Sequence, residues 1–401
     1  MKVMAIICEY NPFHNGHAYQ LQKQKEDLGA DAVICLMSSS FVQRGEPAIV
    51  DKWARAKMAL CGGCDLVLEL PALYSLQSAE GFAFGAVSLL TKLGFEGYLC
   101  FGSESGDIKL LGEIAEAGFS PVYHEKLRET LQTGISYPKA CAAAMQDIIP
   151  KAGEIVSSPN NMLGIEYLRA LSKTGSKLVP KTVQREFGLH DSFVAQKGFL
   201  SATAIRDLLL NGEDVSAYMP QKAYEILMDE FSLGRGPVTK DGLNQLICYA
   251  IRQTDTESLS AISGVSEGLE HRLKDVVKTA RTFQSVAELA KTKRYPYTRI
   301  CRVLMNILLG ITKEDEQLAP AYARILGIGK KGREVLRFLK ETATIPVITK
   351  TANGEFSEKN AKRLFEIEEK ATDLYALLYP NPAKEKNGMD FYRSPVILEQ
   401  D

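Results

Sequence analysis

Short apolar runs alternate with amphipathic helical patterns along the first hundred residues of this 401-residue chain. Four apolar runs predict buried strands: Val3–Cys8, Ala32–Met37, Leu66–Leu70 and Tyr98–Phe101. The intervening segments predict helices: His17–Leu28, Asp51–Cys61 and Ser78–Leu93. Strands joined by crossover helices run parallel, so this order predicts an α/β fold with a Rossmann-like, doubly wound parallel sheet. In such folds, ligands bind at the carboxyl ends of the strands.

The pattern changes in the second half of the chain. Leu178–Gln184 predicts a last strand of this series, and Ser201–Asn211 predicts a helix. Beyond about Asp214 strand patterns nearly vanish, and helical periodicity continues until a short apolar run at Ile345–Ile348. We therefore expect a mainly helical C-terminal domain after the sheet.

These patterns divide the chain into residues 1–210, an α/β domain, and residues 211–401, a mainly helical domain with an irregular tail after Tyr379. The total charge is −1, which predicts no bulk attraction to nucleic acid. The segment His271–Ile345, however, contains 16 Lys and Arg against 7 Asp and Glu, a surplus of 9. The neutral total therefore hides a basic segment within the helical domain.

The composition is that of a soluble globular protein, with 45% hydrophobic and 24% charged residues. Eight cysteines are too few for a disulfide framework. Cys35 lies in a predicted buried strand, where an unpaired cysteine packs as a small apolar residue. Because unpaired cysteines are usual in the reducing cytoplasm, we expect a cytoplasmic protein. Cys61 and Cys64 form a lone Cys-x-x-Cys, for which we expect no zinc or redox role. No stretch reaches the 18 apolar residues of a membrane helix, so we expect no membrane partner.

The segment between the first strand and the first helix carries the strongest chemical signal. It contains His14, Gly16 and His17, at a junction where free main-chain N–H groups and a helix dipole attract anions. Imidazoles can donate hydrogen bonds to phosphoryl oxygens and stabilise charge during phosphoryl transfer. The alternatives are that the histidines merely cap a helix, or that they bind a metal; no third ligand is apparent, so we expect no metal site.

A second polar motif opens the helix predicted at Ser201–Asn211. Ser201 and Thr203 place hydroxyls at the helix start, and Arg206 adds a cation one turn later. This combination suits a triphosphate, although Ser201 alone would be an ordinary helix cap.

The basic segment interleaves cations with aromatic residues. Its candidate RNA-contacting residues are Lys293, Arg294, Tyr295, Arg299 and Arg302. Cations bind phosphates and exposed tyrosines stack on unpaired bases, whereas the alternative is a solvated charged face. A second cluster contains Lys330, Lys331 and Arg333.

The motif His14-Asn15-Gly16-His17, together with Ser201-Ala202-Thr203-Ala204-Ile205-Arg206, resembles the signatures of the His-x-Gly-His nucleotidyltransferase superfamily. Further segments extend the resemblance along most of the chain: Glu9–Phe13, Phe41–Ala48, Lys52–Arg55, Phe101–Glu104, Pro159–Gly164 and Glu267–Arg272. Together they resemble the bacterial tRNA(Met) cytidine acetate ligase family. Coverage is weakest after about residue 345.

The resemblance implies a reaction in two steps. Acetate and ATP give acetyl-adenylate and pyrophosphate, and the acetyl group then passes to N4 of the wobble cytidine of elongator tRNA(Met). ATP, accompanied by Mg²⁺, is a substrate, and no tightly bound prosthetic group is implied. The resemblance assigns catalysis to His14 and His17. It assigns ATP binding to Ile7, Cys8, Glu9, Tyr10, Asn11, Pro12, Phe13, His14, Asn15, Gly16, His17, Gly102, Asn160, Asn161, Arg185, Ser201, Thr203 and Arg206.

Two other functions fit parts of the pattern. A nucleotidyltransferase that adenylates a small phosphorylated metabolite would share both nucleotide motifs but would have no use for a basic helical half. A non-catalytic RNA-binding protein would not need His14, His17 and Arg206 intact. The sequence leaves the oligomeric state open.

Overall fold

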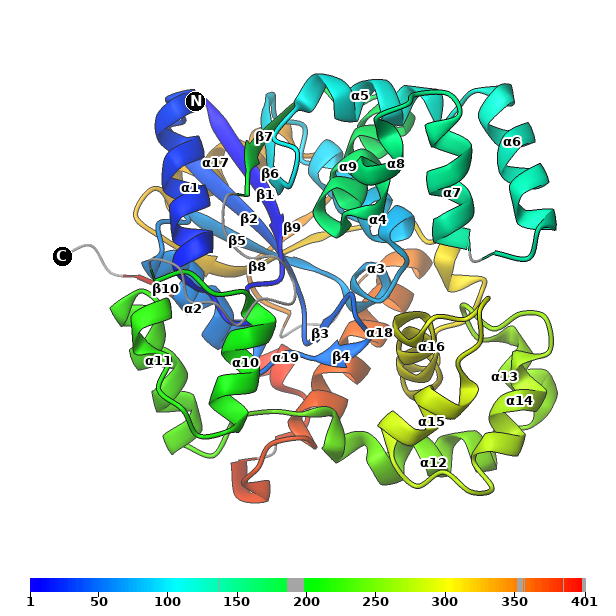
Figure 1. Ribbon diagram of the computed structural model, residues 1–401. Coiled ribbons are helices and arrows are strands. Elements are labelled where there is room, and N and C mark those ends of the chain that lie inside the picture. The colour runs from blue at the N-terminus through cyan, green and yellow to red at the C-terminus, as the bar shows by residue number, and fades with distance from the viewer. Residues whose placement is uncertain (136, 186–197, 352–355, 357, 385, 399–401) are drawn as a thin grey trace.

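The computed structural model describes residues 1–135, 137–185, 198–351, 356, 358–384 and 386–398, and a mostly parallel sheet runs through its centre (Figure 1). The strands of this sheet are β1 Val3–Cys8, β2 Ala32–Ser38, β5 Leu66–Leu70, β6 Gly97–Ser103, β7 Val179–Gln184, β8 Ala323–Ile328, β9 Val347–Ile348 and β10 Val396–Ile397. Their order is β10-β8-β5-β2-β1-β6-β7, with β9 beside β8. A separate small hairpin pairs β3 Phe41–Val42 with β4 Glu46–Pro47.

Both faces of the sheet are buried, as the continuous apolar strands require. Along β1, Val3, Ala5 and Ile7 join one hydrophobic cluster, while Met4 and Ile6 join the other. The first face packs on α3 Ala72–Ser75, α4 Ala79–Lys92 and α9 Pro159–Thr174. The second packs on α1 Asn15–Leu28, α2 Lys52–Cys61, α10 Ala202–Leu210 and α11 Gln221–Ser232. The predicted doubly wound α/β fold is confirmed.

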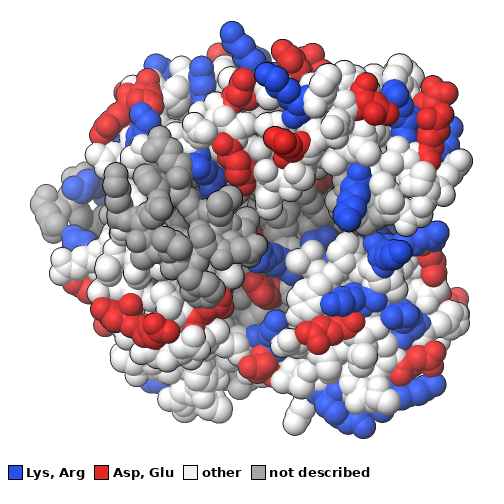
Figure 2. Space-filling view, in the orientation of Figure 1, with Lys and Arg blue, Asp and Glu red and all other residues white. Residues whose placement is uncertain are grey.

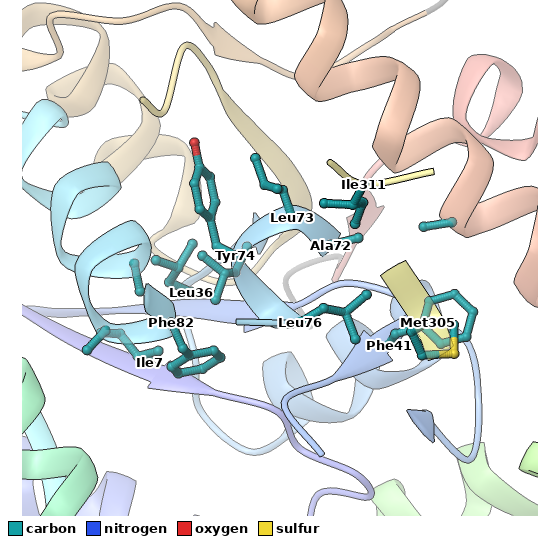
Figure 3. Packing of buried hydrophobic residues seen from close by; sticks show 14 of the residues in the cluster. Ile7, Leu36, Phe41, Ala72, Leu73, Tyr74, Leu76, Phe82, Met305 and Ile311 are labelled. Atoms are coloured by element: carbon teal, nitrogen blue, oxygen red, sulfur yellow. The ribbon is translucent and has the colours of Figure 1, made fainter. Parts of the chain in front are cut away.

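In the part of the chain that the structure describes, nine further helices form two groups beside the sheet (Figure 1). One group is α5 Ile108–Ala117, α6 Pro121–Gln132, α7 Tyr137–Gln146 and α8 Ala152–Ser157. The other, which we call the helical body, is α12 Asn244–Gln253, α13 Thr256–Ala261, α14 Leu269–Val276, α15 Phe283–Ala290 and α16 Tyr297–Leu309. Met305 of α16 and Phe41 of β3 belong to one hydrophobic cluster and lie together in Figure 3. The helical body therefore shares a core with the sheet.

Near its C-terminal end the chain returns to the sheet, which corrects the expectation of a helical chain after residue 210. β8 pairs antiparallel with β5, and β10 pairs parallel with β8. All of β8 is buried, but Arg324 interrupts its apolar run, which hid the strand from the hydrophobic pattern. The short apolar run Ile345–Ile348 contains the two-residue strand β9. A boundary at 210 does not separate the sheet from the rest of the chain.

The tail after Tyr379 is also more ordered than expected. After α17 Gly332–Thr342 and α18 Lys359–Ala376, it forms the short helix α19 Met389–Tyr392 before β10. Asp390 on α19 is 1% exposed. The tail thus contributes a buried charge to the centre of the protein.

One cysteine prediction is wrong. Cys35 on β2 is joined by a disulfide to Cys64, which precedes β5, rather than being an unpaired buried thiol. Cys61 is a free cysteine and does not pair with Cys64. Among the described residues, no helix is both long enough and apolar enough to span a membrane.

A buried ion network holds the tail to the sheet. The Lys52 ammonium at the start of α2 lies 2.6 Å from Glu69, 2.9 Å from Glu368 and 2.8 Å from Asp390, and its side chain is fully buried. Arg324 of β8 pairs with Glu69 and Asp390. Three carboxylates therefore share two cations, and removing one cation would leave charges unpaired in the core.

We predict that Lys52→Met lowers the free energy of unfolding by about 3–5 kcal/mol, because the three carboxylates lose their central partner. Urea unfolding followed by circular dichroism measures this change. Lys173→Met, which breaks the exposed pair with Glu80, is the control and should cost under about 1 kcal/mol. Equal effects of the two substitutions would contradict the role given to the network.

Candidate active site

The turn between β1 and α1 builds the centre of the site. Tyr10 leaves the strand with a φ of 47°, and α1 begins at Asn15 with His14 as its N-cap. The His14 Nδ1 accepts the Gly16 main-chain N–H at 3.1 Å, and the His17 Nδ1 accepts the His14 N–H at 3.3 Å. The histidines therefore cap the helix reciprocally, as Ser and Glu do in a capping box.

This capping fixes the chemical form of both imidazoles. A neutral imidazole has one N–H, and because each Nδ1 accepts a hydrogen bond, the proton must lie on Nε2. The two rings stack with their centroids 3.7 Å apart. Helix capping and ligand binding are thus compatible, because capping uses Nδ1 and leaves an Nε2–H donor on each ring.

The surroundings keep both rings neutral. Burial lowers the pKa of His14 to about 3, and the positive charges of Arg185 and Arg206 contribute to this shift. Burial, His14 and Arg185 hold the pKa of His17 well below its usual value. At neutral pH the pair therefore presents N–H donors within a cationic setting, which suits a polyanion.

A pocket opens beside these rings. It is lined by His14, Gly16, His17 and Gln20 of the α1 region, by Val183–Arg185 at the end of β7, and by Phe199–Ser201 before α10. A Cβ on Gly16 would lie 2.9 Å from the His14 ring, so a side chain here would displace the capping imidazole. In the same orientation as Figure 1, Figure 2 shows a hollow near the centre of the molecule, with Lys and Arg side chains beside it.

The second polar motif reaches the same turn. Ser201 caps α10 by accepting the Ala204 N–H. The Arg206 guanidinium donates to the Asn11 main-chain oxygen at 2.8 Å and lies 3.4 Å from both Thr203 and Glu46. The structure therefore brings together two motifs that are more than 180 residues apart in the sequence, His14–His17 and Ser201–Arg206.

A third group lies at the ends of β6 and β7. Gly102 faces Val183 across these strands, and a Cβ on Gly102 would meet the Arg185 side chain at 3.2 Å. Arg185 donates to the Asn160 side chain at 3.3 Å. These predicted residues are neighbours in the structure.

Glu104 holds this third group and was missed as a site residue. Its Oε1 accepts from the Asn160 amide at 2.7 Å, and its Oε2 accepts the Asn161 main-chain N–H at 2.7 Å. The carboxylate thereby caps α9 and fixes both asparagines. The only sequence signal was its place in Phe101–Glu104.

Within the segment Ile7–His17, several side chains bond to the protein itself. Glu9 accepts the Gln43 main-chain N–H at 2.7 Å, and Asn11 accepts the Ile49 N–H at 2.8 Å. Asn15 donates to the Gly198 and Ala217 carbonyls, and Phe13 is fully buried. Contacts of these residues with ATP stay predictions.

Arg55 is a second residue whose role was missed. Its buried guanidinium donates to the Glu9 carbonyl at 2.6 Å, to the Ser38 carbonyl at 3.0 Å, and to the Ser39 carbonyl. It thus binds the carboxyl ends of β1 and β2 together. A buried arginine inside a helix gives no hint in the sequence of which carbonyls it holds.

The structure separates the predicted RNA-contacting residues. Lys293 is exposed, and Arg294 is 79% exposed with an ion pair to Glu267. Tyr295 is only 6% exposed and donates to the Ser266 carbonyl, so the prediction that its ring stacks on a base is wrong for this conformation. Arg299 lies over the Tyr295 ring at 4.5 Å.

Two other basic features lie elsewhere. Arg302 of α16 donates to the Gln43 carbonyl at 3.3 Å and so contacts the hairpin. Lys330 and Lys331 follow β8, whose Ile328 end lies beside the amino end of β5. The second basic cluster is therefore at the opposite edge of the sheet from His14 and His17.

Three comparisons agree on the relatives of this chain. A family model described as HIGH Nucleotidyl Transferase matches residues 1–390. The tRNA(Met) cytidine acetate ligase of Acetivibrio thermocellus is 42% identical over 99% of this chain and 100% of its own length. That of Thermosipho africanus is 39% identical over the full length of both. This chain belongs to the tRNA(Met) cytidine acetate ligase family.

Solved structures of the family share the fold, and one of them contains an ATP analogue. The apo crystal structure of Thermotoga maritima TmcAL superimposes with a TM-score of 0.93 at 34% identity, covering 99% of this chain and all of that one. The same protein bound with alpha-thio ATP gives a TM-score of 0.90 at 35% identity, again covering 99% of this chain and all of that one. A member of the family thus binds an ATP analogue on this fold.

We predict that His14 stays neutral in the free protein far below its ordinary pKa of 6.5. In the unfolded chain His14 binds a proton near pH 6.5, whereas in the folded chain it does so only near pH 3. The stability that comes from keeping this imidazole neutral is therefore lost as the pH falls from 6.5 to about 3. Ring-proton NMR shifts for His14 should stay constant from pH 8 to pH 5. A titration midpoint near 6.5 would contradict the buried donor pair.

Proposed function

We propose that this protein activates acetate with ATP and acetylates N4 of the wobble cytidine of elongator tRNA(Met). The observation that carries this proposal is the pair of neutral Nε2–H donors at the carboxyl edge of the sheet, beside Arg206 and Arg185. Full-length similarity to tRNA(Met) cytidine acetate ligases supplies the identity of acetate, cytidine and tRNA(Met).

The adenylation step needs positioning and charge neutralisation more than covalent chemistry. The His14 and His17 Nε2–H groups would donate to the phosphates, and stabilise the charge that develops as acetate attacks the α-phosphorus and pyrophosphate leaves. Ser201, Thr203 and Arg206 would bind the pyrophosphate end, while Gly102, Asn160, Asn161 and Arg185 would border the adenosine. Mg²⁺ would arrive bound to the phosphates of ATP. Among the described residues, no group of three or more His, Cys, Asp or Glu could hold a metal ion.

The helical body would bind the tRNA. Lys293 and Arg294 present exposed cations just before α16, and α16 contacts the hairpin beside the candidate site. This arrangement favours the ligase over an enzyme that adenylates a small phosphorylated metabolite, because such an enzyme would not need an exposed basic segment next to its site.

We predict that the protein forms N4-acetylcytidine in tRNA(Met) only when ATP and acetate are both present. The test is incubation with labelled acetate, followed by digestion to nucleosides and chromatography.

His17→Asn should lower acetate-dependent pyrophosphate exchange by about 100-fold or more, because the asparagine oxygen can still accept the His14 N–H while the Nε2–H donor is lost. Binding of tRNA should be retained. If folded wild-type protein produces no acetylcytidine, the proposed function is wrong.

We also predict that neutralising Lys293 and Arg294 together weakens tRNA(Met) binding. The slope of log K against log salt concentration should become less steep by an amount equivalent to about one to two lost phosphate contacts. Fluorescence anisotropy over a range of salt concentrations measures both effects. The matched control neutralises Lys173 and Lys177, two exposed lysines that are each ion-paired, as Arg294 is. Unchanged binding in the first variant, or an equal loss in the control, would place the RNA surface elsewhere.

A further inference from the structure

Transfer of the acetyl group to cytidine requires a proton acceptor. When N4 attacks the carbonyl carbon of acetyl-adenylate, a C–N bond forms and the bond from that carbon to the AMP phosphate oxygen breaks. AMP leaves with the electron pair of that bond, and N4 must give up one proton. The exocyclic amine is a weak nucleophile, so a base placed at this nitrogen would accelerate the step.

The two histidines are not suited to this role. Each Nδ1 already accepts a main-chain N–H, and each Nε2 carries the proton, so neither imidazole has a free acceptor in the described conformation. Their low pKa values also oppose protonation. The rings act as donors, and the acceptor must be another group.

The neighbouring carboxylates are occupied by structural contacts. Both oxygens of Glu104 accept main-chain N–H groups at the start of α9. Glu46 pairs with Arg206 at 3.4 Å. Asp51 caps α2 and accepts from Tyr379. Glu104 and Asp51 therefore cap helices, and Glu46 pairs with the phosphate-binding Arg206.

Glu9 differs from these residues in its position and bonding. It directly follows β1, five residues before His14, and only its Oε1 takes part in the bond to the Gln43 N–H. Its main-chain oxygen is fixed by Arg55 at 2.6 Å, so the residue is held at both ends. The hairpin that holds it contacts α16, so Glu9 lies where the phosphate-binding turn meets the helical body.

We propose that Glu9 is a catalytic residue of the transfer step, whose carboxylate accepts a hydrogen bond from N4 of the cytidine and then takes its proton. Carboxylates recognise cytosine through this amino group. The atoms balance: the proton passes to Glu9 Oε2, the acetyl group to N4, and AMP leaves. Burial raises the pKa of the Glu9 carboxyl, and the Glu46 carboxylate adds to this shift, whereas the Gln43 N–H, Arg206 and Arg55 oppose it. The raised pKa improves Glu9 as a base near neutral pH.

The proposal rests on the proposed function, so the test separates the two half-reactions. Synthetic acetyl-adenylate and tRNA(Met) are supplied directly, and single-turnover formation of N4-acetylcytidine is followed. Glu9→Gln keeps an oxygen that accepts the Gln43 N–H but removes the base. We expect transfer to slow by about 100-fold or more, and acetate-dependent pyrophosphate exchange to fall much less. Glu9→Asp should recover part of the transfer rate.

A pH profile and a matched variant complete the test. The wild-type transfer rate should rise with pH along one ionisation that Glu9→Gln lacks. Glu96→Gln removes an exposed negative charge at the amino end of β6, away from the candidate site, and should keep both the transfer rate and that ionisation. Equal losses in both half-reactions, an unchanged pH profile in Glu9→Gln, or the same transfer defect in Glu96→Gln would overturn the role of Glu9. Failure of the wild-type protein to transfer acetyl at all would instead overturn the proposed function.

Discussion

The reciprocal cap formed by His14 and His17 is the interaction on which the site depends. A helix start leaves main-chain N–H groups without partners, and here two imidazoles satisfy two of them through Nδ1. The same hydrogen bonds decide the tautomer, orient the rings and stack them 3.7 Å apart. The same hydrogen bonds therefore fold the turn and prepare it for a ligand. A ring that did not cap the helix through Nδ1 would no longer be held with its proton on Nε2.

The surrounding protein keeps that turn in place through its main chain. Arg55 binds the Glu9 carbonyl from within the core, and Arg206 binds the Asn11 carbonyl from α10. Both guanidiniums hold main-chain oxygens instead of resting only in ion pairs with carboxylates. Arg206 thereby keeps a cationic character next to the imidazoles, where a triphosphate would need it.

The parallel part of the fold was readable from the sequence because its strands are apolar throughout. Val3–Cys8 and Leu66–Leu70 match β1 and β5 at both ends. The predicted start of the first helix at His17 was late by two residues, because a histidine that caps a helix looks like a helix residue. The strand β8 was hidden by Arg324, whose charge is compensated by Glu69 and Asp390 from distant parts of the chain.

The same limit applies to the candidate site. The motifs gave His14, His17 and Arg206, since these residue types have a direct chemical reason to face a phosphate. The supporting contacts of Arg55 and Glu104 depend on which carbonyls and amides the fold brings near, which no local pattern contains. Tyr295 shows the converse, because a sequence rich in cations and aromatics does not say that the Tyr295 hydroxyl is bonded to Ser266.

The hairpin Phe41–Pro47 determines how the helical body is placed relative to the phosphate-binding turn. On one side its Gln43 N–H binds Glu9, and on the other its Gln43 carbonyl accepts from Arg302. Gly45 has a φ of 76°, and a Cβ there would lie 2.5 Å from the Arg302 main-chain nitrogen, so α16 packs directly on the loop. One residue, Gln43, thus bridges the end of β1 and the helix that follows the exposed Lys293 and Arg294. Under the proposed function, an RNA bound by those cations would meet a site whose distance from them is set by the hydrogen bonds of Gln43 to Glu9 and Arg302, and not by a flexible linker.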